Sequence, residues 1–328
     1  MRLNTPRAAL VGTIAISALA LSGCAASTPA ASSTGLSVVA STNVYGSIAE
    51  SIGGDLVTVT SIISSAAQDP HSYEASAQDQ LALSKADLVI ENGAGYDPFI
   101  DTLLKAASSK APVIDASEES GLLEGDHDHD EAEPSASPSA GASDDDDHEG
   151  HDHIEGFNEH VWYSFHGVEH VAEAIADKLS DLDSDNASTY EKNLAAFTAK
   201  IEKLEATAEA MQPATAGKGA AITEPVPLYL LQEAGFTNKT PAAFSEAIEE
   251  GTDVPPAVLA STLDLFTSRS VALLAYNSQT ASSETEQVRA AAEANDIPVV
   301  EFTETMPDGA DYVSWMTDNL NAIAAAVK

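Results

Sequence analysis

The stretch LSVVASTNVYGSIAESIGGDLVTVTSII, residues 36–63, sets a pattern that the rest of the chain repeats. Its first seven residues, 36–42, are apolar and rich in small or β-branched side chains, which predicts a strand. A helical stretch around residues 48–52 follows and ends at a pair of glycines. A second strand is predicted at residues 56–63. This order of strand, helix and strand is typical of an α/β layer with a parallel sheet.

The alternation continues on both sides of a polar insertion at residues 124–156. Before the insertion, the pattern predicts helices at 76–83, where Ser76 with Asp79 resembles a capping box, and at 98–107, with strands at 87–91 and 112–114. After it, the pattern predicts helices at 167–179, 227–234, 258–266, 284–295 and 312–327, with strands at 219–223, 271–276 and 297–302.

A long helix is predicted at residues 185–211. Its apolar positions step by four and three residues: Tyr190, Leu194, Phe197, Ile201, Leu204, Ala208 and Met211. At 1.5 Å per residue the helix is roughly 40 Å long, more than one small domain needs. A coiled coil is the alternative, but the heptads are few. We therefore predict two α/β lobes with mostly parallel sheets, 36–183 and 213–328, joined by one long spanning helix at 184–212.

The first residues have the features of an export signal. Arg2 and Arg7 precede a short apolar stretch that ends in Leu-Ser-Gly-Cys at Cys24. This ending resembles a bacterial lipobox, in which the cysteine is lipidated; an ordinary signal peptide with a chance cysteine is the alternative. We expect a signal peptide at 1–23, a flexible tether at 24–35, and an extracytoplasmic protein lipid-anchored to the outer face of the cytoplasmic membrane.

The charge of the chain excludes some partners. The formal net charge is −38, and residues 126–155 hold twelve acids, five histidines and no Lys or Arg. Such a segment buries too little apolar surface to fold alone, so we predict a disordered insertion. Nucleic acids and anionic membranes need basic patches, so no nucleic acid is expected to bind the folded surface.

Four side chains follow predicted strands or lie in the loops near them, where open α/β sheets hold ligands. They are His71, His160, Glu224 and Glu304, two from each lobe. Each alone is more often a solvated surface residue. Together, two imidazoles and two carboxylates can bind Zn²⁺, Mn²⁺ or Fe²⁺ in a cleft between the lobes.

The motifs around these residues resemble those of the zinc- and manganese-binding receptor lipoproteins of bacterial ABC importers, called cluster A-I. The similar segments are Asp69-Pro70-His71-Ser72-Tyr73-Glu74, Leu83 to Ile90, Asn92 to Tyr96, Glu159-His160-Val161-Trp162, Thr223-Glu224-Pro225 and Phe302-Thr303-Glu304-Thr305. The resemblance covers nearly the whole mature chain. It implies two lobes, a spanning helix, the four ligands in that order, a usually monomeric receptor, and a partner permease with its ATPase.

The sequence departs from the family pattern at two positions, and the second departure affects the choice of metal. Glu159 replaces a proline before the second ligand, and Glu224 stands where zinc receptors usually have histidine and manganese receptors often have glutamate. The insertion favours zinc, because His127, His129, His148, His151 and His153 place imidazoles beside carboxylates. We expect these histidines to capture metal for the cleft; a solubilising linker is the alternative. The predicted cargo is Zn²⁺, with Mn²⁺ as the alternative.

Two functions of other classes compete with a metal receptor. The run His166-Gly167-Val168-Glu169-His170 fits the inverted zinc-protease pattern, with the histidines one helical turn apart. The pattern is short, however, and Gly167 weakens the helix that it needs. An adhesin or structural lipoprotein with this fold is the second competitor. No phosphate-binding glycine loop or nucleophile elbow is present, so we expect a binding protein and not an enzyme.

Overall fold

A computed structural model describes residues 35–65, 67–68, 70–71, 73–123, 154 and 156–327. It contains two four-stranded parallel sheets with the strand orders β2-β1-β3-β4 and β6-β5-β7-β8. The first sheet consists of β1 (Leu36–Thr42), β2 (Val57–Ile63), β3 (Leu88–Glu91) and β4 (Val113–Asp115). The second consists of β5 (Gly219–Ile222), β6 (Thr237–Asn238), β7 (Leu273–Asn277) and β8 (Val299–Phe302). The predicted α/β class with two parallel sheets is confirmed.

The first sheet is covered on both faces because its strands are apolar on both sides. Alternate side chains of a strand point to opposite faces, and Val38 and Val39 of β1 accordingly belong to two different apolar clusters. One face packs against α2 (Ala77–Leu83) and α3 (Phe99–Ala107). The other packs against α1 (Asn43–Gly53) and α5 (Phe165–Leu182). The short elements η1 (Gly54–Leu56), α4 (Ala116–Glu119) and η2 (Val161–Tyr163) complete this lobe.

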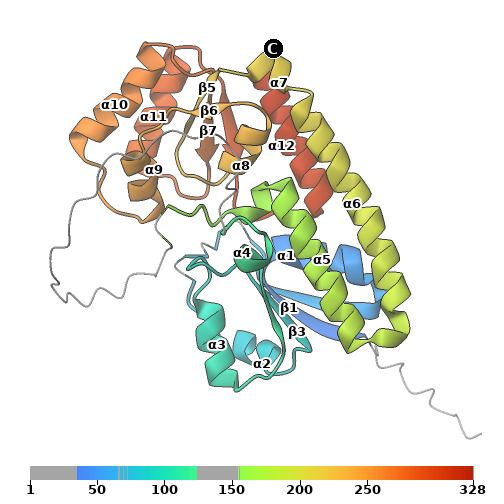
Figure 1. Ribbon diagram of the computed structural model, residues 1–328. Helices are drawn as coiled ribbons and strands as arrows, with labels where there is room; N and C mark the ends of the chain where they lie inside the picture. Colours follow the sequence, from blue (N-terminus) through green and yellow to red (C-terminus); the bar gives the residue numbers. More distant parts are fainter. Residues whose placement is uncertain are drawn as a thin grey trace, which may run out of the picture. The chain divides into compact units, whose positions relative to one another are not determined.

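The second sheet is arranged in the same way. Ala221, Leu274 and Tyr276 face a cluster formed with α9 (Ala242–Glu249), α10 (Pro256–Thr267) and α11 (Ser283–Ala294). The opposite face, with Ala220 and Ala275, packs toward α8 (Leu228–Glu233) and α12 (Tyr312–Ala326). Figure 1 shows the two groups of helices on the two sides of the sheet. Each sheet thus presents the carboxyl ends of its strands as an edge from which loops can carry side chains.

The long helix α6 (Ala187–Glu209) contacts both lobes. It packs on α1 and α5 of the first lobe and on α8 and α12 of the second (Figure 1). Phe197, Ile201 and Leu204 on its buried stripe belong to the apolar cluster that also includes residues of both sheets. The short helices η3 (Ser184–Asn186) and α7 (Gln212–Thr215) lie directly before and after it in the sequence. The predicted spanning helix is confirmed, and the apolar cluster along it is continuous between the lobes.

Polar contacts also join the lobes beside this cluster. The side-chain amide of Asn43 in α1 donates to the carbonyl oxygen of Met306 at 3.0 Å and accepts from its backbone N–H at 3.1 Å. The hydroxyl of Ser47 accepts from the N–H of Tyr312 at 3.1 Å. These bonds fix the segment that follows β8 against the first lobe.

Several features lie outside what the sequence predicted or the structure describes. Strand β6 and helix α9 were not predicted from the sequence. None of the helices in the described ranges is long and apolar enough to cross a membrane. Cys24 and the five insertion histidines, His127, His129, His148, His151 and His153, lie outside the described residues. The signal peptide, tether and insertion boundaries stay predictions.

Candidate metal site

The four predicted ligands line one small cavity. The chain after β2 carries His71, the residue two positions after β5 is Glu224, and the residue two positions after β8 is Glu304. His160 lies directly before η2, where the chain enters α5. Glu249 and Thr280 complete the lining. The cavity has a volume of about 10 Å³, roughly the space of one water molecule or one dehydrated ion.

The ligand atoms approach distances that a metal ion requires. One atom each from His71, His160 and Glu304 lies within 4.8 Å of the others. Nε2 of His71 is 3.8 Å from Oε2 of Glu304. Atoms bound tetrahedrally at 2.0–2.2 Å lie about 3.3–3.6 Å apart, so small side-chain rotations bring these three to one ion. Glu224 is not in this closest set, but it lines the same cavity.

The amide of Asn277 at the end of β7 joins the two carboxylates. Its side-chain nitrogen donates to Oε1 of Glu304 at 2.9 Å and also to Oε2 of Glu224. The hydroxyl of Tyr96, from the first lobe, donates to Oε2 of Glu304 at 3.1 Å. Both carboxylates are only 3% exposed. Buried acidic groups this close would repel each other without donors between them, so these contacts hold the carboxylates in position.

The imidazole of His160 is oriented by an amide as well. Nδ1 of His160 is 2.8 Å from Oδ1 of Asn158, which favours a proton on Nδ1 and leaves Nε2 as the atom that a metal ion would bind. The side-chain nitrogen of Asn158 donates to the carbonyl oxygen of Pro225 at 3.1 Å, directly after Glu224. Trp162 packs edge-to-face on the His160 ring, with the two ring centroids 5.1 Å apart. The ring of His71 packs on Tyr96 in the same way, with the centroids 4.8 Å apart.

A third acidic group, Glu249, lines the same cavity and was missed by the sequence analysis. Its Oε1 is 3.7 Å from Nδ1 of His160. Burial raises the pKa of Glu249 from 4.5 to about 9, and the nearby carboxylates of Glu159, Glu224 and Glu304 raise this pKa further. Glu249 therefore keeps its proton at neutral pH in the absence of a cation. The helix that carries it, α9, was not predicted, although Phe244, Ala247 and Ile248 have helical spacing.

The inverted protease pattern lies elsewhere. His166 and His170 are on α5, exposed, and neither lines the cavity of the four predicted ligands. Glu169, the base that a protease would need, is partly buried, and burial raises its pKa.

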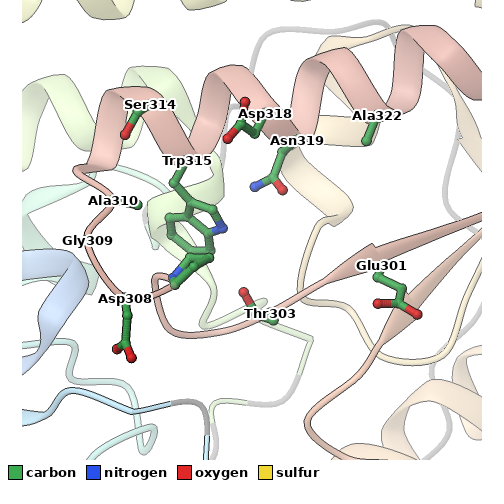
Figure 2. Close-up of a pocket in the computed structure, with 11 residues that line it drawn as sticks. Glu301, Thr303, Asp308, Gly309, Ala310, Ser314, Trp315, Asp318, Asn319 and Ala322 are labelled. Atoms are coloured by element: carbon green, nitrogen blue, oxygen red, sulfur yellow. The ribbon is translucent and has the colours of Figure 1, made fainter.

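A second, larger cavity of about 570 Å³ lies on the other side of the segment after β8. Thr303 lines this cavity, whereas its neighbour Glu304 lines the small one. Figure 2 shows Trp315 and Asn319 projecting from α12 toward the segment that carries Thr303. The carboxylates of Glu301, Asp308 and Asp318 come from three different sides and do not converge (Figure 2). This cavity therefore does not present a set of metal ligands.

Two parallel α/β lobes with an ion-sized polar cavity lined from both define the chain as a solute-binding type of protein. A family model described as zinc-uptake complex component A, periplasmic, matches residues 38–326. The chain belongs to this family.

Individual known proteins are similar in sequence or fold. The manganese ABC transporter substrate-binding lipoprotein ScaA of Streptococcus gordonii is 29% identical over 188 residues, which cover 54% of this chain and 52% of ScaA. The periplasmic zinc-binding protein TroA of Treponema pallidum has a TM-score of 0.69 at 18% identity, covering 89% of this chain and 99% of TroA. A ZnuA crystal structure has a TM-score of 0.68 at 23% identity, with 90% and 100% covered. The chain spans about half the length of the curated relatives that it matches.

Proposed function

We propose that this protein is an extracytoplasmic receptor that captures a divalent transition-metal ion, Zn²⁺ in particular, and delivers it to an ABC permease and its ATPase. The observation that carries the proposal is the cavity lined by His71, His160, Glu224 and Glu304 from both lobes. The metal is the cargo of this protein. The family membership and the names of the relatives, which are metal-binding lipoproteins of ABC transporters, support the same role.

The donor set fits binding better than catalysis. Two imidazoles and two carboxylates can satisfy Zn²⁺ at 2.0–2.2 Å in a closed tetrahedral shell. Such a shell leaves no position open for a substrate, whereas a catalytic zinc keeps one for water. The cavity has no room for a substrate beside the ion. Asn277 and Tyr96 hold the carboxylate of Glu304, and Asn158 holds the ring of His160, so hydrogen bonds orient these groups toward the cavity.

Manganese is the second candidate cargo, because relatives of this chain are named manganese-binding proteins. Glu224 adds a carboxylate, a ligand that suits Mn²⁺. At equilibrium Zn²⁺ should still bind more tightly, because affinities of divalent metals follow the Irving–Williams order. We propose zinc because two imidazoles line the cavity and five more occur in the insertion, at His127, His129, His148, His151 and His153.

The proposed location of the receptor rests on the first residues of the chain and on the names of its relatives. Lipidation of Cys24 would hold the chain on the outer face of the cytoplasmic membrane, with residues 24–35 as a tether. The relatives are named lipoproteins. Metabolic labelling with a radioactive fatty acid tests this step: label should enter the wild-type chain and be lost in Cys24→Ser. A fully labelled Cys24→Ser chain would contradict the anchor.

The decisive experiment identifies the metal and the cavity together. The protein is isolated without added metal, and the identity and amount of its bound metal are measured. Calorimetric titrations in which Zn²⁺ and Mn²⁺ compete then compare the two affinities. The first zinc ion that the wild type binds, with the highest affinity, should no longer bind tightly to the double variant His71→Ala/His160→Ala. It should bind normally to Gln287→Ala, an exposed control on α11. An unchanged tight equivalent in the double variant would remove the cavity from the proposal. Manganese would be the cargo if the isolated protein contains manganese and zinc does not bind more tightly than manganese in the competition titration.

A further inference from the structure

The paired histidines on α5 have a geometry that the cleft site does not use. His166 and His170 are one helical turn apart, and their Nε2 atoms lie 3.3 Å from each other. The ring centroids are 4.6 Å apart, with the ring planes at 90°. Both residues are exposed, with 44% of the His170 side chain accessible. Two imidazole nitrogens therefore meet at the surface, on a helix that packing holds in place.

The separation of these nitrogens matches what one metal ion requires. Imidazole nitrogens bind Zn²⁺ at 2.0–2.1 Å, and two ligands at a tetrahedral angle then lie about 3.3–3.4 Å apart. The observed 3.3 Å falls at this value. It is longer than the common N–H hydrogen-bond distance of about 2.9–3.0 Å. Residues four apart on a helix face the same side, so the backbone already brings the pair together.

The surroundings of the pair favour a cation. Oε2 of Glu173 is 3.6 Å from Nδ1 of His170, and a carboxylate on that side favours a proton on Nδ1 and a lone pair on Nε2. Glu169 is on the same helix face, and its Oε1 accepts no hydrogen bond from the residues that the structure describes. Glu202 and Glu205 of α6 act electrostatically on Glu169. Carboxylates thus lie beside the pair on α5 and on the neighbouring helix α6.

We propose that His166 and His170 form a second, surface binding site for a divalent transition-metal ion that prefers imidazole, such as Zn²⁺ or Cu²⁺. The protein supplies two nitrogens, and water completes the shell. With fewer protein ligands than the cleft cavity, this site binds its ion more weakly and exchanges it faster. The site does not depend on which metal the cleft carries, or on whether the cleft binds one.

The test uses the full chain with the five insertion histidines, His127, His129, His148, His151 and His153, replaced by alanine, so that they cannot contribute weak binding. Zinc titration of this variant should show a tight phase from the cleft and a separate weak phase. Adding either His166→Ala or His170→Ala should remove the weak phase and leave the tight phase unchanged. Asp181→Asn, an exposed substitution near the end of the same helix, is the control and should keep both phases.

Anomalous diffraction locates the weak ion. Crystals of the wild-type chain soaked in zinc should show an anomalous peak between the two Nε2 atoms, and His170→Ala crystals should lack it. A weak phase that survives both single substitutions, or zinc-soaked crystals without a peak at α5, would overturn the surface site. Loss of the tight phase concerns only the cleft, so the two proposals fail separately.

Discussion

Nε2 of His71 lies 3.8 Å from Oε2 of Glu304, although the two residues belong to different lobes. His71 follows a strand of the first sheet, and Glu304 follows a strand of the second. Only 12% of the His71 side chain and 3% of the Glu304 side chain are exposed. A cation that replaces this contact with two metal–ligand bonds would therefore connect the lobes directly.

Removal of either partner should strongly weaken metal binding. We expect His71→Ala and Glu304→Gln each to lower zinc affinity by more than the roughly 10–100-fold that is lost when only a hydrogen-bond partner of a ligand is removed. Competition with a chelator of known affinity measures the change. Glu246→Gln, an exposed change on α9, is the matched control for the carboxylate and should bind zinc as the wild type does. Equal affinities for Glu304→Gln and Glu246→Gln would contradict the role of Glu304.

Asn277 should matter more for the metal-free protein than for the metal-bound protein. Its amide donates to the carboxylates of both Glu224 and Glu304. In Asn277→Ala the two buried acids lose this donor, which should cost about 1–3 kcal/mol of unfolding free energy. A bound cation compensates the same charges, so the loss should shrink in excess zinc. Denaturant unfolding with a chelator and with zinc measures both values. Equal losses in the two conditions would show that Asn277 acts only through packing.

Glu249 should make metal binding release protons. Its pKa of about 9 keeps the carboxyl protonated at neutral pH, and a nearby divalent cation lowers the pKa of an acid. Zinc binding at pH 7 should therefore release a proton from Glu249, and zinc affinity should rise with pH up to about 9. Calorimetry in buffers of different ionisation enthalpy counts the protons. Zinc binding to Glu249→Gln should release fewer protons than binding to the wild type. The zinc affinity of this variant should also rise less steeply with pH above pH 7. The exposed neighbour Glu250→Gln should behave as the wild type does.

Glu233 should make folding stability fall as pH rises. Its Oε1 accepts from the N–H of Phe165 at 3.1 Å. Burial raises its pKa from 4.5 to about 8 in the folded chain. Between these values the unfolded chain gives up a proton that the folded chain keeps, so stability decreases across this window. Glu233→Gln removes the penalty, and its advantage should grow between about pH 5 and pH 8.

Urea unfolding at several pH values measures the difference between Glu233→Gln and the wild type. Exposed Glu209→Gln is the control, and its difference from the wild type should not change with pH over the same window. A constant difference for Glu233→Gln would show that Glu233 is ionised in the folded protein.

The sequence predicted the elements whose residues carry strong local patterns. The strand at residues 36–42 was predicted with its observed bounds because it is short, apolar and followed by a helix. The capping box of Ser76 and Asp79 is also present as predicted. By contrast, β6 has two residues, too few to show a period. Helix α9 lies between prolines and acids, where turn signals compete with its helical spacing.

At the candidate site too, the sequence predicted the residues in recognisable local motifs and missed those placed there by packing. His71 and His160 could be found because histidine is rare outside the insertion and because their neighbours form recognisable motifs. Glu249 could not, because it is one of 52 acidic residues and reaches the cavity only through the packing of α9. Asn277 ends β7, yet nothing in its local sequence shows that it lies between two carboxylates. Contacts between distant segments decide such roles, and short-range patterns do not contain them.

The cavity of about 10 Å³ has a consequence for how fast the proposed cargo ion would be exchanged. An ion with its full hydration shell is far larger than this space, so it can enter or leave only when it loses or regains its inner waters. His160 and Glu304 are almost completely covered by protein, and solvent cannot assist this step until the chain moves. The dwell time of such an ion would therefore be set by the frequency of these openings, and a partner that widens the cavity would shorten it without changing a single ligand.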